Sequence, residues 1–480
     1  MANNYARVTQ FKDLQSFREY LASEKIDIKL AELPPPGESA LAEKIAHNGR
    51  TIGNRWAILP MEGWDCTDDG APSEYTRRRW LNFARSGAKL IYGTEAAAVM
   101  HSGRSNPQQL MVADHTAGAL KDMCKEMRQV HKDKFGSDED LLIGLQLTHS
   151  GRYSHPNEAA KLESVTAYSN PLLDKKFGNS AANVVSDEEV QNIIQHFIKA
   201  AVIAQEAGFD FVDIKQAHGY LAHEFLSAID RPGPYGGSFE NRTRFFREIA
   251  EGIKKAAPGL ELSARLSIFD IVPFIKGGDG VGKPMEYSGN YPYAFGADAT
   301  GMNMDENLTE VVKFVKVMQE YGVSLICATI GSPYYCVHMQ RPAYYPVADG
   351  YEMPEHPLYN VSRHIKAVAR LKELCPDIKV VGSGYTCLQE YLPNAAEYAV
   401  ANGLTDFVGI GRMVLSYPDM PADILAGKKL DRCRICRTLG DCTNAPRHGM
   451  ISGCYPLDHF YKELPEAQRL KAIKELARKK

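Results

Sequence analysis

Short apolar segments recur along this chain, and each is followed by a longer segment whose hydrophobic residues have helical spacing. The apolar segments span residues 55–61, 88–92, 140–147, 209–215, 260–267, 323–330, 378–383 and 406–411. Their length and their β-branched content predict eight buried strands. Helical periodicity follows near 73–86, 115–135, 186–207, 238–257, 306–321, 358–375 and 386–402. Ser186 with Glu189 at its start and Gly208 at its end delimit one of these helices.

Regular alternation of buried strands and helices predicts a parallel α/β fold, because each crossover helix must cover a face of the sheet. Eight units close most simply into a (β/α)8 TIM barrel, although an open doubly wound sheet gives the same alternation. We expect an N-terminal helical extension over residues 1–37, the barrel over 38–425 and a cysteine-rich tail over 426–480. The Gly-, Tyr- and Pro-rich stretch at 269–305 is predicted to form a lid or substrate loop.

Composition and charge exclude several classes of protein. The chain is 44% hydrophobic with a net charge of -3, so it has no basic excess for nucleic acid or an anionic membrane. It contains no run of about 18 apolar residues and no secretory leader, which predicts a cytoplasmic protein without a membrane segment. We therefore expect a small-molecule substrate, and a homo-oligomer is compatible with the sequence.

In a parallel barrel the carboxyl ends of the strands form the active face, so polar residues there are the first candidates for chemistry. They are Glu62, Gln146, Lys215, His218, Tyr220 and Arg265. The last two predicted strands end in glycine turns that contain Gly384 and Gly411, and Arg412 follows directly. Backbone N–H groups at such turns commonly bind a phosphate. The chain therefore carries a candidate phosphate site next to a set of candidate catalytic side chains.

Four segments resemble the old yellow enzyme family of NADH:flavin oxidoreductases. They are the run from Asn54-Arg55 to Pro60-Met61, GLQLTHSGRYSHP (144–156), FDFVDIKQAHGYLAHEFLS (209–227) and RPGPYGGSFENRTRF (231–245). The similarity extends over about residues 38–425. It implies an FMN-dependent oxidoreductase that transfers a hydride between the flavin and a small organic substrate.

The resemblance also implies roles for individual residues. Pro60, Met61 and Gln146 match positions that contact the isoalloxazine, and Arg265 matches a cation near flavin N1 and O2, where a positive charge stabilises reduced flavin. A structural ion pair inside the barrel is the alternative for Arg265. Gly384, Gly411 and Arg412 match the residues that hold the phosphate. Glu62 stands where relatives carry Thr or Cys near flavin O4 or N5.

On the substrate side, His218 matches one of two hydrogen-bond donors to a carbonyl, and Tyr220 matches the proton donor. Lys215 occupies the place of the other donor, commonly His, and could bind a substrate carboxylate, whereas Glu62 could meet a cationic substrate. The preferred activity is reduction of an activated C=C bond, with amine dehydrogenation or demethylation as the alternative. Two other classes stay open: a Schiff-base lyase acting through Lys215, and a non-catalytic flavin redox module.

Cys433, Cys436, Cys442 and Cys454 form a C-x2-C-x5-C-x11-C motif in the tail. Iron-sulfur relatives similar to 2,4-dienoyl-CoA reductase and trimethylamine dehydrogenase carry cysteines just after the barrel, which implies a 4Fe-4S cluster here. Those relatives have two or three residues between the second and third cysteines, and this chain has five. A zinc site and unligated thiols are the alternatives. A cluster would exchange electrons with a separate electron-transfer protein, and NAD(P)H is the alternative direct reductant.

Overall fold

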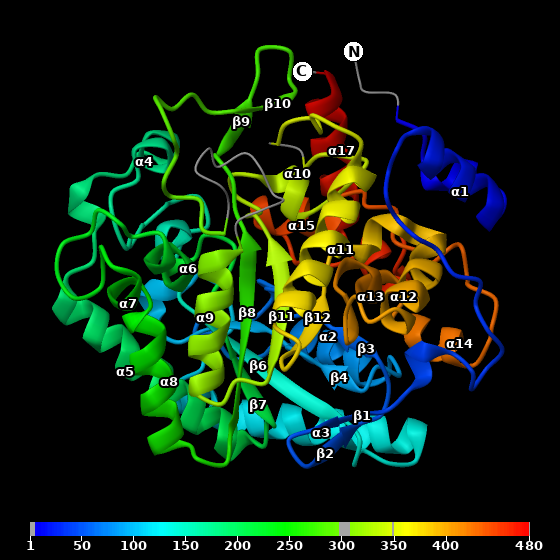
Figure 1. Cartoon of the computed structure of the whole chain (residues 1–480), viewed down its shortest axis with the longest axis horizontal. Helices are drawn as coiled ribbons and strands as arrows, with labels where there is room; N and C mark the ends of the chain where they lie inside the picture. The colour runs from blue at the N-terminus through cyan, green and yellow to red at the C-terminus, as the bar shows by residue number, and fades with distance from the viewer. Residues whose placement is uncertain (1–4, 297–307, 348–349, 480) are drawn as a thin grey trace.

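The structure is a computed structural model that describes residues 5–296, 308–347 and 350–479. Its centre is a closed ring of parallel strands (Figure 1). In order these are β3 (Trp56–Ile58), β4 (Leu90–Ile91), β6 (Leu142–Thr148), β7 (Phe211–Ile214), β8 (Glu261–Phe269), β11 (Leu325–Ile330), β12 (Lys379–Gly382) and β13 (Phe407–Ile410). The last strand pairs with the first, Val408 opposite Trp56. This closure confirms the (β/α)8 barrel and excludes the open sheet.

Each of the eight predicted segments overlaps one barrel strand, and long helices cover the ring between them. The helices are α2 (Glu74–Ala84), α3 (Ala117–Phe135), α5 (Asp187–Ala207), α8 (Arg244–Ala256), α9 (Thr309–Glu320), α11 (Pro357–Leu374) and α12 (Leu392–Ala401). The hydroxyl of Ser186 accepts a hydrogen bond from the Glu189 N–H at 3.1 Å, and Gly208 ends α5 with φ 90°. Both predicted ends of this helix are therefore confirmed.

Shorter elements lie in the connections that follow the strands. They are β5 (Ala96–Ala98), α4 (Pro171–Phe177), α6 (Leu221–Leu226), α7 (Phe239–Arg242), α10 (Val337–Gln340) and α13 (Arg412–Ser416). The stretch predicted to be a lid contains an antiparallel hairpin of β9 (Phe274–Lys276) and β10 (Gly282–Pro284). Residues 297–305 of that stretch lie outside the described residues.

The amino-terminal half of the barrel interior is filled by side chains. Tyr92 is buried there, and its hydroxyl donates to the Ala264 carbonyl at 2.9 Å and accepts from the Cys327 N–H at 2.9 Å. The hairpin of β1 (Ile45–His47) and β2 (Arg50–Ile52) lies at this end, where His47 contacts Glu261 at 2.9 Å. Because this end is packed, a ligand can enter the barrel only from the carboxyl ends of the strands.

The two segments outside the barrel pack onto it. In the N-terminal segment, α1 (Leu14–Ser23) places Phe17 against Tyr391 with ring centroids 4.5 Å apart. Helix α14 (Met420–Leu425) ends directly before the tail, which contains α15 (Asp441–Arg447), α16 (His459–Lys462) and α17 (Glu466–Lys479). Arg78 of α2 forms two hydrogen bonds to Asp458, at 2.8 and 3.0 Å. Figure 1 shows α15 and α17 beyond the ends toward which β8 and β11 point, so the tail lies near the open end of the barrel.

Within the described ranges, no helix has both the length and the apolar character needed to cross a membrane.

Candidate active site

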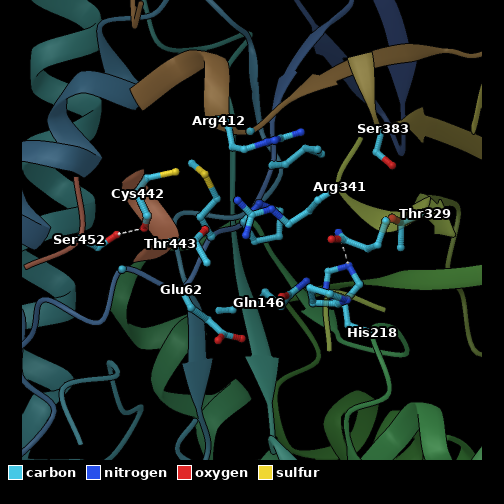
Figure 2. Close-up of a pocket in the computed structure, with 18 of the residues that line it drawn as sticks. Glu62, Gln146, His218, Thr329, Arg341, Ser383, Arg412, Cys442, Thr443 and Ser452 are labelled. Atoms are coloured by element: carbon cyan, nitrogen blue, oxygen red, sulfur yellow. Dashed lines mark hydrogen bonds between the residues drawn. The ribbon is translucent and has the colours of Figure 1, made fainter. Parts of the chain in front are cut away.

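A cavity of about 240 Å³ lies at the carboxyl end of the barrel (Figure 2). Segments that follow the barrel strands form most of its wall, and the tail forms the rest. All the flavin and substrate residues predicted from the sequence line it: Pro60, Met61, Glu62, Gln146, Lys215, His218, Tyr220, Arg265, Gly384, Gly411 and Arg412. The expectation that polar residues at the carboxyl ends of the strands form the active face, which we call the strand-end rule, is therefore met. Residues up to 352 positions apart in the sequence, from Pro60 to Arg412, line the same cavity.

Glu62 is the centre of the hydrogen bonds at one end of the cavity. Its Oε1 accepts from Lys215 Nζ at 2.8 Å, and its Oε2 accepts from Ser105 Oγ at 2.8 Å. The hydroxyl of Tyr220 lies 2.7 and 2.8 Å from the two carboxylate oxygens. The Lys215 side chain is only 3% exposed, and its Nζ also lies 3.5 Å from the centroid of the Tyr220 ring. Lys215 and Glu62, which the sequence suggests as separate substrate contacts, are thus an ion pair.

Tyr220 is a protonated phenol in this setting. Burial raises its pKa well above the ordinary value, and the neighbouring Glu62 raises it further. Its hydroxyl also contacts the hydroxyl of Tyr334 at 2.8 Å. Tyr334 stacks on Tyr153 with ring centroids 3.9 Å apart and planes 5° apart. The Tyr220 hydroxyl is therefore held by a carboxylate on one side and a second phenol on the other.

His218 is fixed by its backbone as well as by its ring. It has φ 69°, in the left-handed region that non-glycine residues rarely adopt. Its N–H donates to Ser267 Oγ at 3.0 Å, and its carbonyl accepts from Ser332 Oγ at 2.6 Å. Nε2 lies 3.1 Å from the amide nitrogen of Gln340. Burial lowers the pKa of His218 well below its usual value, so the imidazole is neutral.

Gln146 and Arg265 share a buried carboxylate. Asp213 accepts from the Gln146 amide nitrogen and from the backbone N–H of Arg265. Burial raises the pKa of Asp213 to about 6, against the hydrogen bonds and the Arg265 charge that lower it. The Arg265 guanidinium donates to the Pro60 carbonyl at 3.3 Å. These contacts fix both side chains while leaving part of each directed at the cavity.

Several buried polar atoms of the lining residues have no hydrogen-bond partner within the described chain. They are Gln146 Oε1, Arg265 Nε, Thr329 Oγ1, Gln340 Oε1 and Arg412 Nη1. Buried polar groups are normally paired, so these atoms indicate that a polar ligand completes the site. The donors and acceptors of an isoalloxazine edge and a phosphate match them. The residues present therefore fit FMN.

The other end of the cavity is rich in arginine. Arg341, Arg412 and Arg447 line it together with Gly384, which has φ 92°, and Gly411. Burial lowers the pKa of Arg341 to about 10, and the nearby Arg412 contributes. Glu62 is the only carboxylate among the described lining residues, and in Figure 2 it lies at the opposite end from Arg412. Such a concentration of positive charge suits a phosphate dianion.

The tail cysteines converge only in part. Cys436, Cys442 and Cys454 line a second cavity of about 20 Å³, which shares Arg412, Leu415 and Cys442 with the larger one. The fourth cysteine of the motif, Cys433, is exposed and does not line it. Among the described residues, no three His, Cys, Asp or Glu side chains are arranged to hold a metal ion. All ten cysteines are free thiols.

The sequence matches the NADH:flavin oxidoreductase / NADH oxidase family over residues 44–286. It is 30% identical to an NADPH dehydrogenase of Bacillus subtilis (strain 168) over 375 residues, which cover 77% of this chain and 89% of that protein. An NADPH dehydrogenase of Bacillus cytotoxicus is 27% identical, and the aligned region covers 77% of this chain and 88% of that protein. The chain belongs to this family. It is an FMN-dependent oxidoreductase.

Solved structures support the same fold. Superposed on this chain, a complex of 2-naphthoyl-CoA reductase has a TM-score of 0.62 at 18% sequence identity. Histamine dehydrogenase from Rhizobium sp. 4-9 has a TM-score of 0.61 at 21% sequence identity. Both cover 88% of this chain, which spans 57% and 53% of their lengths. An old yellow enzyme homologue from Zymomonas mobilis has a TM-score of 0.54 at 18% identity and covers 82% of this chain and 94% of its own.

Several residues of this family member's site are absent from the sequence-based set. Tyr334 and Arg341 follow β11, so a stricter use of the strand-end rule would have included them. Arg79 lies inside a run of three arginines on α2, where nothing in the sequence distinguishes it. It pairs with Glu95 at 2.7 Å and Asp65 at 2.8 Å. Because Glu95 also accepts from the Gly63 N–H at 2.6 Å, this buried network holds the segment that carries Glu62.

Proposed function

We propose that this FMN-dependent oxidoreductase reduces the activated C=C bond of a small organic substrate and that Tyr220 supplies the proton. The observation that carries the proposal is the buried Tyr220 hydroxyl, which lies in the cavity that fits the flavin and retains its proton because its pKa is raised. A positioned phenol of this kind can act as a general acid. When bound, the flavin supplies a hydride from N5 to one alkene carbon. Tyr220 then protonates the other carbon.

Contacts on the flavin side support this assignment. Gln146 and Arg265 offer an unpaired acceptor and an unpaired donor to the polar edge of the ring, and Pro60 with Met61 would form the surface beneath it. Arg412, together with the backbone at Gly384 and Gly411, would hold the phosphate. These roles follow the resemblance, and the buried unpaired atoms are the independent support for them.

On the substrate side, the neutral His218 can donate one hydrogen bond to an activating carbonyl. Lys215 donates one of its three N–H groups to Glu62 at 2.8 Å and lies over the Tyr220 ring, so we assign the carbonyl contact to His218. After Tyr220 has given up its proton, the Tyr334 hydroxyl at 2.8 Å can donate to the resulting phenolate. In this proposal His218 polarises the alkene through its carbonyl group, and the hydrogen bond from Tyr334 assists recovery of the acid.

The proposal is tested with the purified holoprotein. Flavin released by denaturation should be FMN, and anaerobic NADPH or NADH should bleach its visible absorption. Mixing the reduced protein with cinnamaldehyde should restore that absorption and yield the saturated aldehyde. Recovery of FAD, no flavin after reconstitution with FMN, or reduced flavin that no activated alkene reoxidises would contradict the proposal. We propose NADPH as the reductant because the relatives are called NADPH dehydrogenases.

We also propose that Cys433, Cys436, Cys442 and Cys454 bind a 4Fe-4S cluster. The meeting of Cys436, Cys442 and Cys454 at one cavity supports this, whereas the exposed position of Cys433 means that its segment must move. A separate electron-transfer protein is the partner that such a site would serve. Protein purified without oxygen should contain about four iron atoms and equivalent sulfide per chain. Zinc, or no metal after reconstitution, would leave NAD(P)H as the only proposed reductant.

A further inference from the structure

The loops that follow β8 and β11, which are neighbouring strands of the barrel (Figure 1), are joined by backbone hydrogen bonds. The Gly331 N–H donates to the Phe269 carbonyl at 2.7 Å. The Phe274 N–H donates to the Tyr335 carbonyl at 2.6 Å. Asp270 is the first residue after β8 and lies between the two contacts in the sequence. The start of the predicted lid stretch is therefore attached to the loop after β11.

The Asp270 carboxylate is buried at this junction and is only 3% exposed. Its Oδ2 accepts from the Tyr335 hydroxyl at 2.5 Å, and its Oδ1 accepts from the Ile271 N–H at 2.9 Å. The Cys336 thiol donates to Oδ1 at 3.8 Å. Within the described residues, no group of opposite charge offsets its burial. Because a buried carboxylate is costly without hydrogen bonds, these three donors and the carboxylate hold one another in place.

The ring of Tyr335 lies against the backbone that joins His218 to Tyr220. A Cβ atom at Gly219 would lie only 2.7 Å from Cε1 of that ring, and Gly219 has φ 79°. This close approach requires glycine, and it means that a shift of the Tyr335 ring would displace the segment that carries both substrate-side residues.

Two other residues of the loop after β11 touch the same segment directly. The Ser332 hydroxyl donates to the His218 carbonyl at 2.6 Å. The Tyr334 hydroxyl lies 2.8 Å from the Tyr220 hydroxyl. The loop that Asp270 holds is therefore the support for the carbonyl donor and for the acid.

We propose that Asp270 is a positioning residue for alkene reduction: it holds Tyr335, and Tyr335 and its loop place His218 and Tyr220 for proton transfer. This inference rests on the proposed alkene reductase function. Asp270 does not line the cavity, so it acts only through its neighbours. A displacement of about 1 Å at a reacting group can cost on the order of 100-fold in rate, so a residue outside the cavity can have a measurable effect.

Ionisation of Asp270 gives this role a pH signature. Burial raises its pKa to about 7, against the hydrogen bonds that lower it. The titratable groups around it are Tyr335 and Cys336 after β11, Tyr153 after β6, Tyr291 of the lid stretch and, beyond Cys336, Lys176 of α4. Burial raises the pKa of the three phenols and the thiol, so they stay protonated, and it lowers the pKa of Lys176 to about 8. Because a charged acceptor forms the stronger hydrogen bond, Tyr335 should be held more firmly as the pH rises through about 7.

The test uses FMN-loaded protein whose flavin is reduced and then mixed with cinnamaldehyde at a series of pH values. The rate of flavin reoxidation in wild type should rise about threefold as the pH passes through about 7. Asp270→Asn should be about tenfold slower above that pH and lack this rise, with normal FMN content and flavin reduction. Asp213 and Glu95, whose pKa values burial raises to about 6 and about 7, remain in the variant, so any pH dependence that they cause persists. A rise of full size in Asp270→Asn, or a wild-type rate, would overturn the proposal.

A double-mutant cycle checks that Asp270 acts through Tyr335. Tyr335→Phe removes the same hydrogen bond from the other side and should slow reoxidation by about threefold to tenfold. Since both variants break one contact, Asp270→Asn/Tyr335→Phe should be no slower than the slower single variant, and effects that multiply would contradict this route. Asp230→Asn is the matched control, because this exposed carboxylate accepts from Tyr293 of the same lid stretch. It should keep the wild-type rate and pH profile.

The outcomes separate this inference from the function on which it rests. If no activated alkene reoxidises the wild-type flavin, the alkene reductase proposal fails. Hydrogen–deuterium exchange at residues 331–336 then tests the positioning without turnover, and it should be about threefold faster in Asp270→Asn than in Asp230→Asn. If the alkene is reduced and Asp270→Asn changes neither rate nor exchange, the function stands and the positioning role fails. Should Asp270→Asn not fold, Tyr335→Phe gives the answer by the same two measurements.

Discussion

The two cofactor sites predicted from this sequence behave differently in the structure. Every residue predicted for the flavin site lines one cavity, although the residues come from all parts of the barrel. Of the four cysteines, which lie within 22 residues of one another, three line one small cavity without the arrangement needed to hold a metal ion, and Cys433 remains at the surface. Closeness in the sequence is therefore a poorer guide to convergence than position at the end of a strand.

The physical reason lies in what fixes each backbone. Gln146 belongs to β6, and the hydrogen-bonded register of β6 with β7 fixes the backbone position from which its side chain extends. The cysteines lie in loops and in the short helix α15, which have no such ladder. Metal-binding loops commonly acquire their final geometry together with the metal. The predictions below test this difference between a site built by the barrel and a site built by loops.

The largest effect is expected from Tyr220→Phe. Removal of the acid should slow reoxidation of reduced flavin by cinnamaldehyde by about 10²- to 10⁴-fold, while FMN content and flavin reduction stay normal. Tyr153→Phe is the matched control, because that buried hydroxyl has no hydrogen-bond partner among the described residues and does not line the cavity. Stopped-flow absorption measures both. An unchanged oxidative rate in Tyr220→Phe would remove this residue from the mechanism.

Arg412→Ala should weaken FMN binding by about 10- to 150-fold, which corresponds to about 1.5–3 kcal/mol for a charged hydrogen bond. Its Nη2 donates to the Pro342 carbonyl at 2.9 Å, whereas its Nη1 is buried without a partner among the described residues and can meet the phosphate. Arg434→Ala, which removes a half-exposed pair with Asp419 at 2.9 Å, serves as the control. Titration of apoprotein with FMN gives the constants. Equal affinities in the two variants would reject the proposed phosphate site.

Cys436→Ala tests whether the proposed cluster site in the loops is independent of the FMN site in the barrel. Iron should fall from about four atoms per chain to below one, because a cubane cluster needs its thiolate ligands. The dissociation constant of FMN should change by less than threefold. Cys375→Ala, a buried cysteine outside the motif, should keep its iron. Wild-type iron content in Cys436→Ala would show that this thiol is not a ligand.

The smallest effect is expected where the tail attaches to the barrel. Arg78→Ala removes two hydrogen bonds to Asp458 and a contact 4.3 Å above the Phe460 ring. The pair is partly exposed, at 30% and 14%, so its loss should cost about 1 kcal/mol. Limited proteolysis should then cleave the tail about threefold to fivefold faster than in wild type. The matched surface variant Arg370→Ala should be cleaved at the wild-type rate. If the tail of Arg78→Ala is also cleaved at the wild-type rate, contacts other than Arg78–Asp458 hold the tail on the barrel.

Much of the fold follows from periodicity. Eight buried segments alternating with helices give the barrel, and the strand-end rule then gives the residues of the cavity. The helix ends at Ser186 and Gly208 could be placed because helix ends have characteristic local residues. The closure of β13 on β3 could not be derived from alternation alone, since an open sheet satisfies the same pattern.

The pairing of side chains across the cavity could not be predicted from the sequence. Glu62 and Lys215 are 153 residues apart, and each taken alone suggests a substrate of opposite charge. Their contact depends on the tilt of two strands and on the network of Arg79 with Asp65 and Glu95 beneath the Glu62 segment. Arg447 was missed for a similar reason, because its position depends on how the tail folds back.

The pairing of β13 with β3, which closes the barrel, affects how the chain folds during its synthesis. Val408 pairs with Trp56, so 352 residues separate the two sides of the closing contact. At typical rates of synthesis of about 5–20 residues per second, the first strand waits roughly 20–70 s for its last neighbour. Throughout that interval its outer edge can form hydrogen bonds with other chains. The nascent protein is therefore most prone to aggregate before its final strand emerges, and a chaperone that covers β3 would act at that stage.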